Sequence, residues 1–109
     1  MLTITVRFQV RPEWCDGWLD LVSEFTEATR AEDGNAWFWW SRSVDDPCVF
    51  FLLEGHREAT VADHLASPLI PKIRKEWPQA LVATPMVITA AVPGEGWQPM
   101  DDLLPVPAD

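Results

Sequence analysis

Two histidines carry the most versatile chemistry in this chain of 109 residues. An imidazole titrates near neutral pH, so His56 or His64 could accept the proton of a weak acid such as a phenol. Each histidine also has a structural interpretation. His64 would order the turn before Pro68 by hydrogen bonding to a neighbouring carboxylate or backbone group, and His56 would face solvent at the end of a strand.

Arg7 and Thr5 are the second group of candidates, because they lie on the polar face of a strand that we expect at the centre of a sheet. Buried polar groups need partners. Arg7 could therefore form an ion pair, with Glu54 as a candidate partner, or stabilise negative charge on a substrate oxygen. We predict His64 and Arg7 as catalytic residues, and Thr5 and His56 as substrate contacts.

Four consecutive aromatic residues lie within the stretch Asn35–Ser43. Side chains alternate across a strand, so Trp37 and Trp39 share one face, and Phe38 and Trp40 share the other. One pair should pack under helices and the other against a second subunit. We predict that Trp37 and Trp39 face the helices and contact substrate; ordinary core packing is the alternative for either pair.

Hydrophobic periodicity predicts the elements that must position these residues. Residues 2–10 alternate as a strand, and an apolar stripe at helical spacing follows Pro12 and ends at the turn Glu32–Gly34. Further along, we predict strands at 35–43, 48–54 and 86–92, and helical segments at 58–66 and 71–77. The order β-α-β-β-α-β is that of the α+β ferredoxin-like fold, an antiparallel sheet with helices on one face.

Both faces of the predicted sheet are apolar, which predicts a homodimer. One layer of helices leaves the far face of the sheet bare, and the simplest cover is a second subunit packed sheet to sheet. We expect the domain to span residues 1–92. A tail rich in proline and acidic residues follows over 93–109, with one aromatic anchor at Trp97.

Composition argues against several classes of partner. The formal net charge of −9 disfavours nucleic acid, which selects for clustered Lys and Arg, and also disfavours anionic membrane surfaces. No apolar run approaches the ~20 residues of a membrane span, and no signal peptide precedes the first strand, so we expect a cytoplasmic protein. Cys15 and Cys48 form no zinc or CxxC pattern and are expected to be reduced thiols.

Several stretches together resemble the antibiotic biosynthesis monooxygenase family. They are Gly34, Arg42–Pro47, the strand Phe50–Glu54 and Asp63–Pro68, in the family's order and spacing. The resemblance implies a dimeric α/β barrel with a pocket between the sheet and the helices, and it places Phe51 and Leu53 towards that pocket. It also implies a monooxygenase without metal or flavin. In such an enzyme a quinol- or anthrone-type aromatic is deprotonated, and its anion passes an electron to dioxygen.

The chain departs from the family's pattern where the third strand ends. The family usually has an aromatic residue at the position of Gly55, so a non-catalytic ligand-binding or structural module is the alternative to an enzyme. The haem-degrading branch uses an Asn, a Trp and a His where this chain has Thr5, Gly55 and Arg74. Haem degradation is therefore the least favoured function.

Overall fold

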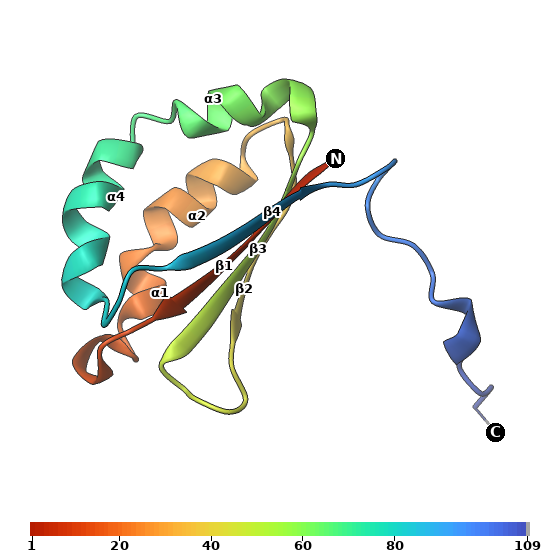
Figure 1. The fold of residues 1–109 in the computed structure, drawn as a ribbon, viewed down its shortest axis with the longest axis horizontal. Helices are drawn as coiled ribbons and strands as arrows, with labels where there is room; N and C mark the ends of the chain where they lie inside the picture. Colours follow the sequence, from red (N-terminus) through yellow and green to blue (C-terminus); the bar gives the residue numbers. More distant parts are fainter. Residues whose placement is uncertain (109) are drawn as a thin grey trace.

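The fold is a four-stranded antiparallel sheet with helices on one face. The computed structural model describes residues 1–108. Its strands are β1 (Leu2–Gln9), β2 (Asn35–Arg42), β3 (Val49–His56) and β4 (Met86–Ala91), in the spatial order β2-β3-β1-β4. Figure 1 shows the sheet nearly edge-on with the helical layer on one side. The ferredoxin-like prediction is confirmed, and β1 lies between β3 and β4 as expected.

The predicted first helix is divided into three short segments. They are the 3-10 helix η1 (Pro12–Trp14) and the α-helices α1 (Trp18–Leu21) and α2 (Ser23–Arg30). The second break falls at Val22, whose backbone leaves the helical region at φ −92° and ψ 0°. The apolar stripe survives both breaks, because Trp18, Val22 and Phe25 are all buried towards the sheet.

The second half of the helical layer runs between β3 and β4. It comprises η2 (Glu58–Thr60), α3 (Val61–Leu65), α4 (Ile70–Glu76) and η3 (Trp77–Ala80). Pro68 separates α3 from α4, and Pro71 lies in the first turn of α4, where a missing N–H leaves no hydrogen bond unmade. Among residues 1–108, none of the helices is long and apolar enough to cross a membrane.

The core between sheet and helices is built largely from aromatic rings. The ring centroid of Trp18 lies 5.1 Å from that of Phe8 and 5.6 Å from that of Trp77. Phe8 and Trp77 are themselves 5.9 Å apart with their planes at 72°. Such tilted and edge-to-face pairs add about 0.5–1.5 kcal/mol each to the stabilisation from burial. This aromatic layer fixes β1 and β3 beneath α1 and η3.

β2 turns Phe38 and Trp40 towards the helices, so the predicted orientation of this strand is wrong. Phe38 is 1% exposed, and Trp40 Nε1 donates a hydrogen bond of 2.8 Å to a threonine on α2. Trp37 and Trp39 lie on the opposite face, which we call the open face. There their ring centroids lie 5.4 and 5.5 Å from that of Trp97. The alternation of side chains along the strand correctly grouped the four aromatic residues into two pairs, but it could not show which pair packs against the helices.

β3 requires the same correction. Phe50 and Leu52 are buried under the helices. Phe51 and Leu53, which the resemblance placed towards the pocket, therefore lie on the open face.

Cys15 and Cys48 are joined in a disulfide, so the prediction of two reduced thiols is wrong. Their Cα atoms lie 5.1 Å apart, within the usual range for a disulfide. The bond connects the segment after η1 to the residue before β3. The two cysteines are 33 positions apart in the sequence and become neighbours only in the folded protein, so no short spacing motif could predict the bond.

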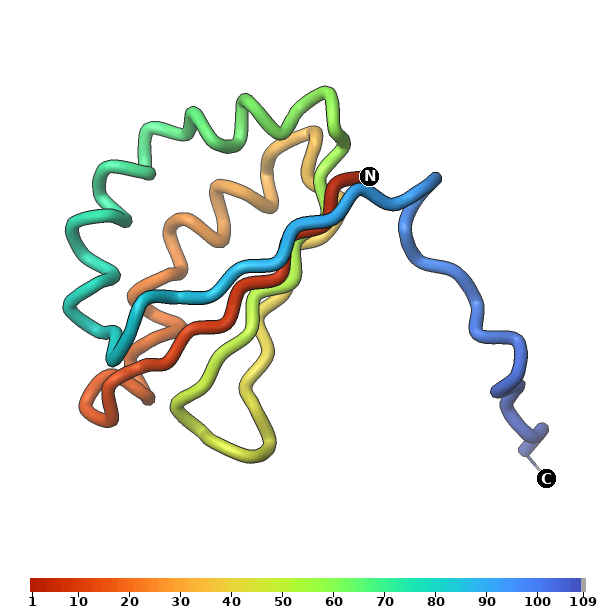
Figure 2. The backbone as a smooth tube through the Cα atoms, in the orientation of Figure 1, coloured from red at the N-terminus to blue at the C-terminus, as the bar shows by residue number. Residues whose placement is uncertain are grey.

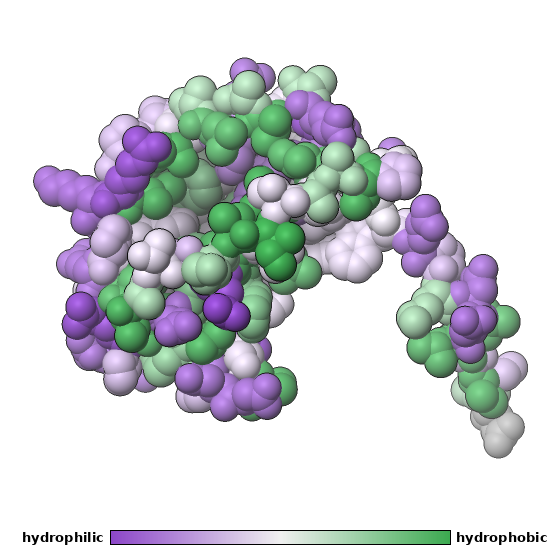
Figure 3. Space-filling view, in the orientation of Figure 1, coloured by the Kyte–Doolittle hydropathy of each residue, from purple (hydrophilic) through white to green (hydrophobic). Residues whose placement is uncertain are grey.

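The C-terminal segment leaves the body of the protein after β4. Figure 2 follows it from the end of β4, beside the N-terminus, into an extended stretch that points away from the sheet. It includes the 3-10 helix η4 (Asp101–Leu103), and Figure 3 shows hydrophobic and hydrophilic groups mixed along it. Trp97 makes the aromatic contact of this segment with the sheet. The division into residues 1–92 and 93–109 stays a prediction.

Candidate functional site: a buried network of carboxylates and imidazoles

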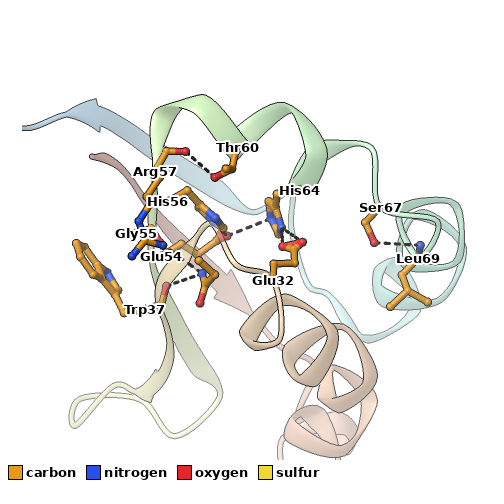
Figure 4. Close-up of polar contacts among 11 residues, drawn as sticks. Glu32, Trp37, Glu54, Gly55, His56, Arg57, Thr60, His64, Ser67 and Leu69 are labelled. Carbon is orange, nitrogen blue, oxygen red and sulfur yellow. Dashed lines mark hydrogen bonds and ion pairs between the residues drawn. The ribbon is translucent and has the colours of Figure 1, made fainter. Parts of the chain in front are cut away.

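Two carboxylates and two imidazoles meet at the end of the sheet beneath α3. Glu54 and His56 are two residues apart on β3, so both point to the helix face. His64 lies on α3, and Glu32, in the turn between α2 and β2, contacts it. Figure 4 shows His64 between Glu32 and Glu54, with His56 beside Glu54. We call these four residues the imidazole network.

Each ring nitrogen of His64 faces a carboxylate. Nδ1 lies 2.8 Å from Glu32 Oε1, and Nε2 lies 3.4 Å from Glu54 Oε1. His56 Nε2 lies 2.9 Å from the same Glu54 oxygen, and the two imidazole rings stack with centroids 4.3 Å apart. An ionised carboxylate accepts hydrogen bonds and cannot donate them. With both carboxylates as acceptors, His64 Nδ1 donates to Glu32 and His56 Nε2 donates to Glu54.

Burial and hydrogen bonding shift the pKa values of the network in opposite directions. Burial alone lowers the pKa of His64, but hydrogen bonds with Glu54 and Glu32 outweigh it and raise that pKa above its usual value. Burial alone raises the pKa of Glu54, but hydrogen bonds from His56 and His64 outweigh it and leave that pKa below its usual value. Both shifts favour the charged pair, a protonated His64 beside an ionised Glu54.

The turn that carries Glu32 is held against η2 by close backbone contacts. The carbonyl of Gly34 accepts a hydrogen bond of 2.9 Å from the backbone N–H of Arg57, whose guanidinium donates to the carbonyl of Asp33 at 2.5 Å. A Cβ at Gly34 would collide with the side chain of Thr60. Glycine therefore allows the approach that brings Glu32 within reach of α3.

A β-bulge at the start of β2 adds Asn35 to this edge of the sheet. Asn35 pairs with His56 and Trp37 pairs with Gly55, which leaves Ala36 as an extra residue. The bulge places Asn35 on the side of His56 and Trp37 on the open face. Asn35 Nδ2 donates hydrogen bonds to the carbonyls of Trp37 and Gly55, at 2.9 and 3.4 Å. The bulge thus ties the ends of β2 and β3 together beside the network.

A pocket of about 340 Å³ opens beside the network. Its volume lies within the range of about 300–1,000 Å³ that is typical of small-molecule sites. The described residues that line it are Glu32, Asp33, Gly34, Asn35, His56, Thr60, Asp63 and His64. None of these is a tryptophan or a phenylalanine, so the pocket has no flat aromatic wall, and three of its residues are acidic.

The structure brings His56 and His64 together and separates them from the other predicted site residues. Those six lie across the sheet, on the open face: Thr5, Arg7, Trp37, Trp39, Phe51 and Leu53. Thr5, Arg7 and Phe51 line a second groove there, of about 290 Å³. The expected ion pair between Arg7 and Glu54 does not form, because Glu54 points to the helices.

Sequence reasoning missed Glu32, Glu54 and Asn35 as members of the site. Glu54 had a usable signal, since a carboxylate two residues before a histidine on one strand shares its face. Glu32 lies in a turn, and its contact with α3 depends on the packing of Gly34. Asn35 reaches the site through the bulge, which simple alternation does not predict.

The network has two chemical capacities. It can hold and pass protons, because its polar contacts join imidazole nitrogens to carboxylate oxygens. It also offers donor atoms to a cation, since one ligand atom from each of Glu54, His56 and His64 lies within 4.8 Å of the others.

Solved structures support the fold. Rv0793 from Mycobacterium tuberculosis is 26% identical with a TM-score of 0.74, over 84% of this chain and 93% of that one. A protein from Deinococcus radiodurans, solved as a proposed antibiotic biosynthesis monooxygenase, is 21% identical with a TM-score of 0.79, over 92% and 99% of the two chains. One from Nitrosomonas europaea, described in the same way, is 19% identical with a TM-score of 0.77, over 86% and 100%.

The family follows from the sequence itself. Comparison with curated proteins gave no match. Residues 1–76, which include β1 to α4 and all four members of the imidazole network, match the family described as antibiotic biosynthesis monooxygenase. That match covers well over half of the chain, and the chain therefore belongs to the antibiotic biosynthesis monooxygenase family.

Proposed function

We propose that this protein is a monooxygenase that oxidises a small electron-rich aromatic, of the quinol or anthrone type, with dioxygen. The observation that supports this most is the buried imidazole network at the wall of a ligand-sized pocket, in a chain of this family. Removing a proton makes such an aromatic a better electron donor, because the anion gives up an electron to dioxygen more readily than the neutral molecule. A site of this kind must therefore accept a proton and stabilise an anion.

His56 is the proton acceptor in this proposal. Its contact with Glu54 uses Nε2, which leaves Nδ1 to take the proton of the substrate. Glu54 then stabilises the imidazolium, as a carboxylate orients the histidine base in other enzymes. His64, predicted as catalytic, has both nitrogens engaged with carboxylates. It contributes its positive charge to the anion, which is the role first expected of Arg7.

The proposed reaction balances without an external reductant. For an anthrone, a ring CH₂ becomes a carbonyl, and the substrate supplies all four electrons. One atom of dioxygen enters that carbonyl and the other leaves as water. The proposal therefore invokes no flavin, haem or metal.

Oxygen uptake with a panel of hydroquinones and anthrones tests the proposal. We expect saturable uptake above the spontaneous rate, and His56→Gln should lower kcat by about 100-fold or more, since general base catalysis typically contributes 10²–10⁴-fold. Glu24→Gln is the matched control, because Glu24 is exposed on α2 and pairs with Lys72 away from the pocket. Uptake no faster than without protein across the panel would refute the function.

A non-catalytic binding module is the second candidate, and the acidic residues and missing aromatic wall of the pocket favour it. Such a module would bind a small polar or cationic ligand without turning it over. Native mass spectrometry of the purified protein reports a retained ligand directly. A retained ligand together with no oxygen uptake supports the module, whereas uptake that depends on His56 excludes it.

We further propose a homodimer formed through the open face. Large apolar side chains are exposed there, with Trp39 48%, Met86 60% and Ile88 72% exposed. A second sheet packed on this face would bury them and close a barrel. Native mass spectrometry should show a dimer, and Trp39→Glu should convert it to a monomer. A monomeric wild-type protein contradicts this assignment.

A further inference from the structure

We propose that Glu54, His56 and His64 bind one divalent first-row transition-metal ion such as Zn²⁺. Imidazole nitrogen and carboxylate oxygen are ordinary ligands of these ions, and two histidines with one carboxylate form a familiar set. All three side chains are at most 6% exposed as residues, and they come from two elements, β3 and α3, already packed together. The donor set is thus largely assembled before an ion arrives. This inference does not rest on the proposed oxidation.

The distances between donor atoms fit such an ion. With metal–ligand bonds of about 2.0–2.2 Å, ligand atoms lie about 3 Å apart at right angles and about 3.4 Å apart at tetrahedral angles. Glu54 Oε1 lies 2.9 Å from His56 Nε2 and 3.4 Å from His64 Nε2. The widest pair of the three ligand atoms is no more than 4.8 Å apart, so it would close slightly around the ion.

Glu32 supplies the support that metal-binding histidines usually have. Its carboxylate accepts a hydrogen bond from His64 Nδ1 at 2.8 Å, which orients the ring and directs Nε2 towards Glu54. A carboxylate on the far nitrogen of a histidine fixes the tautomer that a metal needs and strengthens the ligand. The described contacts of His64 therefore include both a candidate metal ligand and an orienting group.

The neighbouring pocket provides an entry path and room for further ligands. His56 and His64 both line it, so an ion between them could hold water or another small molecule on the open side. Asp33 and Asp63 also line the pocket, and their negative charges favour the approach of a cation. The ion would replace the protons on His56 Nε2 and His64 Nε2, the two nitrogens that face Glu54. An ion on His56 Nε2 would therefore separate His56 from Glu54, the carboxylate that stabilises its imidazolium in the proposed oxidation.

Calorimetric titration of the tag-free protein with Zn²⁺ tests the site, with Co²⁺ absorption as a second probe. We expect one ion per chain, and no comparable heat with Mg²⁺, which prefers oxygen ligands. His56→Ala should weaken binding by more than the about 10–100-fold expected for Glu32→Gln, which removes only an orienting group. Glu24→Gln, on the exposed face of α2, should bind as wild type does.

A measurement on the wild-type protein keeps the test valid even if His56→Ala fails to fold. The chain has two histidines, so an NMR spectrum of the imidazole groups contains only His56 and His64. Both should shift together as Zn²⁺ reaches one equivalent. The proposal is overturned if Zn²⁺ does not bind with a stoichiometry of one, or if it binds while either imidazole stays unchanged. Because no substrate is present, neither outcome bears on the proposed oxidation.

Discussion

Gly55→Ala should destabilise this protein, because Gly55 lies directly beneath the indole of Trp37. A Cβ added at Gly55 would lie 2.5 Å from both Cδ2 and Cζ2 of that ring. Ordinary contacts between carbon atoms are about 3.5–4.0 Å, so the ring must retreat by roughly 1 Å or more. On its outer side the ring is covered by Trp97 at 5.4 Å between centroids, and a Cβ at Gly96 would lie 2.9 Å from it.

The magnitude follows from this confinement. Trp37 is 8% exposed, so its ring cannot swing freely into solvent. Adding a methyl group to a well-packed site typically costs about 1–3 kcal/mol. With an unfolding entropy of about 2.1 cal/mol/K per residue, each kcal/mol lowers Tm by about 4 °C for 109 residues. We therefore expect Tm to fall by about 4–13 °C.

Thermal unfolding followed by circular dichroism measures this change, and two variants make the result specific. Gly17→Ala is the control, because a Cβ there meets its nearest atom, in Trp14, at 4.0 Å. Its Tm should stay unchanged or rise slightly. In a Trp37→Ala background the added methyl of Gly55→Ala has no ring to meet and should have little effect. A Gly55→Ala protein as stable as wild type would refute the packing described here.

Three further predictions concern the network, the disulfide and the tail. The pKa of His64 is raised from 6.5, so its contribution to the free energy of unfolding is lost as pH rises through the raised pKa. The pKa of Glu54 is lowered from 4.5, so its contribution is lost as pH falls through the lowered pKa. Urea unfolding should therefore show the greatest stability at mildly acidic pH. In His64→Gln, the free energy of unfolding should fall less steeply as the pH rises above that range. Thiol titration of the native protein should find neither Cys15 nor Cys48 free, and Cys48→Ala should lower the free energy of unfolding by about 2–4 kcal/mol. Trp97→Ala should lower the free energy of unfolding by about 1–3 kcal/mol through the loss of two aromatic contacts, and should leave Zn²⁺ binding unchanged.

The fold was predictable from the sequence because local hydrophobic periodicity identifies its strands and helices. The alternation of residues 2–10 specifies β1, and the stripe through Trp18 and Phe25 specifies the helical face, even though the helix is divided at Val22. The orientation of β2 was not predictable in the same way. Both of its faces carry large aromatic rings, so burial favours neither side, and the contact of Phe38 with Phe25 decides it only in three dimensions.

The candidate site was predictable only in part, for a related reason. His56 was identified by its chemistry, and His64 by its chemistry and by the family motif at Asp63–Pro68, but their partners depend on contacts between distant elements. Glu32 meets His64 across 32 positions of sequence, in a turn whose placement depends on a glycine. Arg7 was assigned to the same site because polarity on a central strand looked functional, yet the sheet separates it from both histidines.

The β-bulge at Ala36 places the residues before and after it on opposite faces of the sheet, so the two sets can be substituted independently. Asn35, before the bulge, faces the imidazole network, and Trp37 and Trp39, after it, face the open side of the sheet. Substitutions of these two tryptophans would therefore change the open face without altering the residues that line the pocket. Asn35 is the exception, because its single amide group holds carbonyls of both β2 and β3. Mutations that alter one face at Asn35 would therefore also disturb the other face.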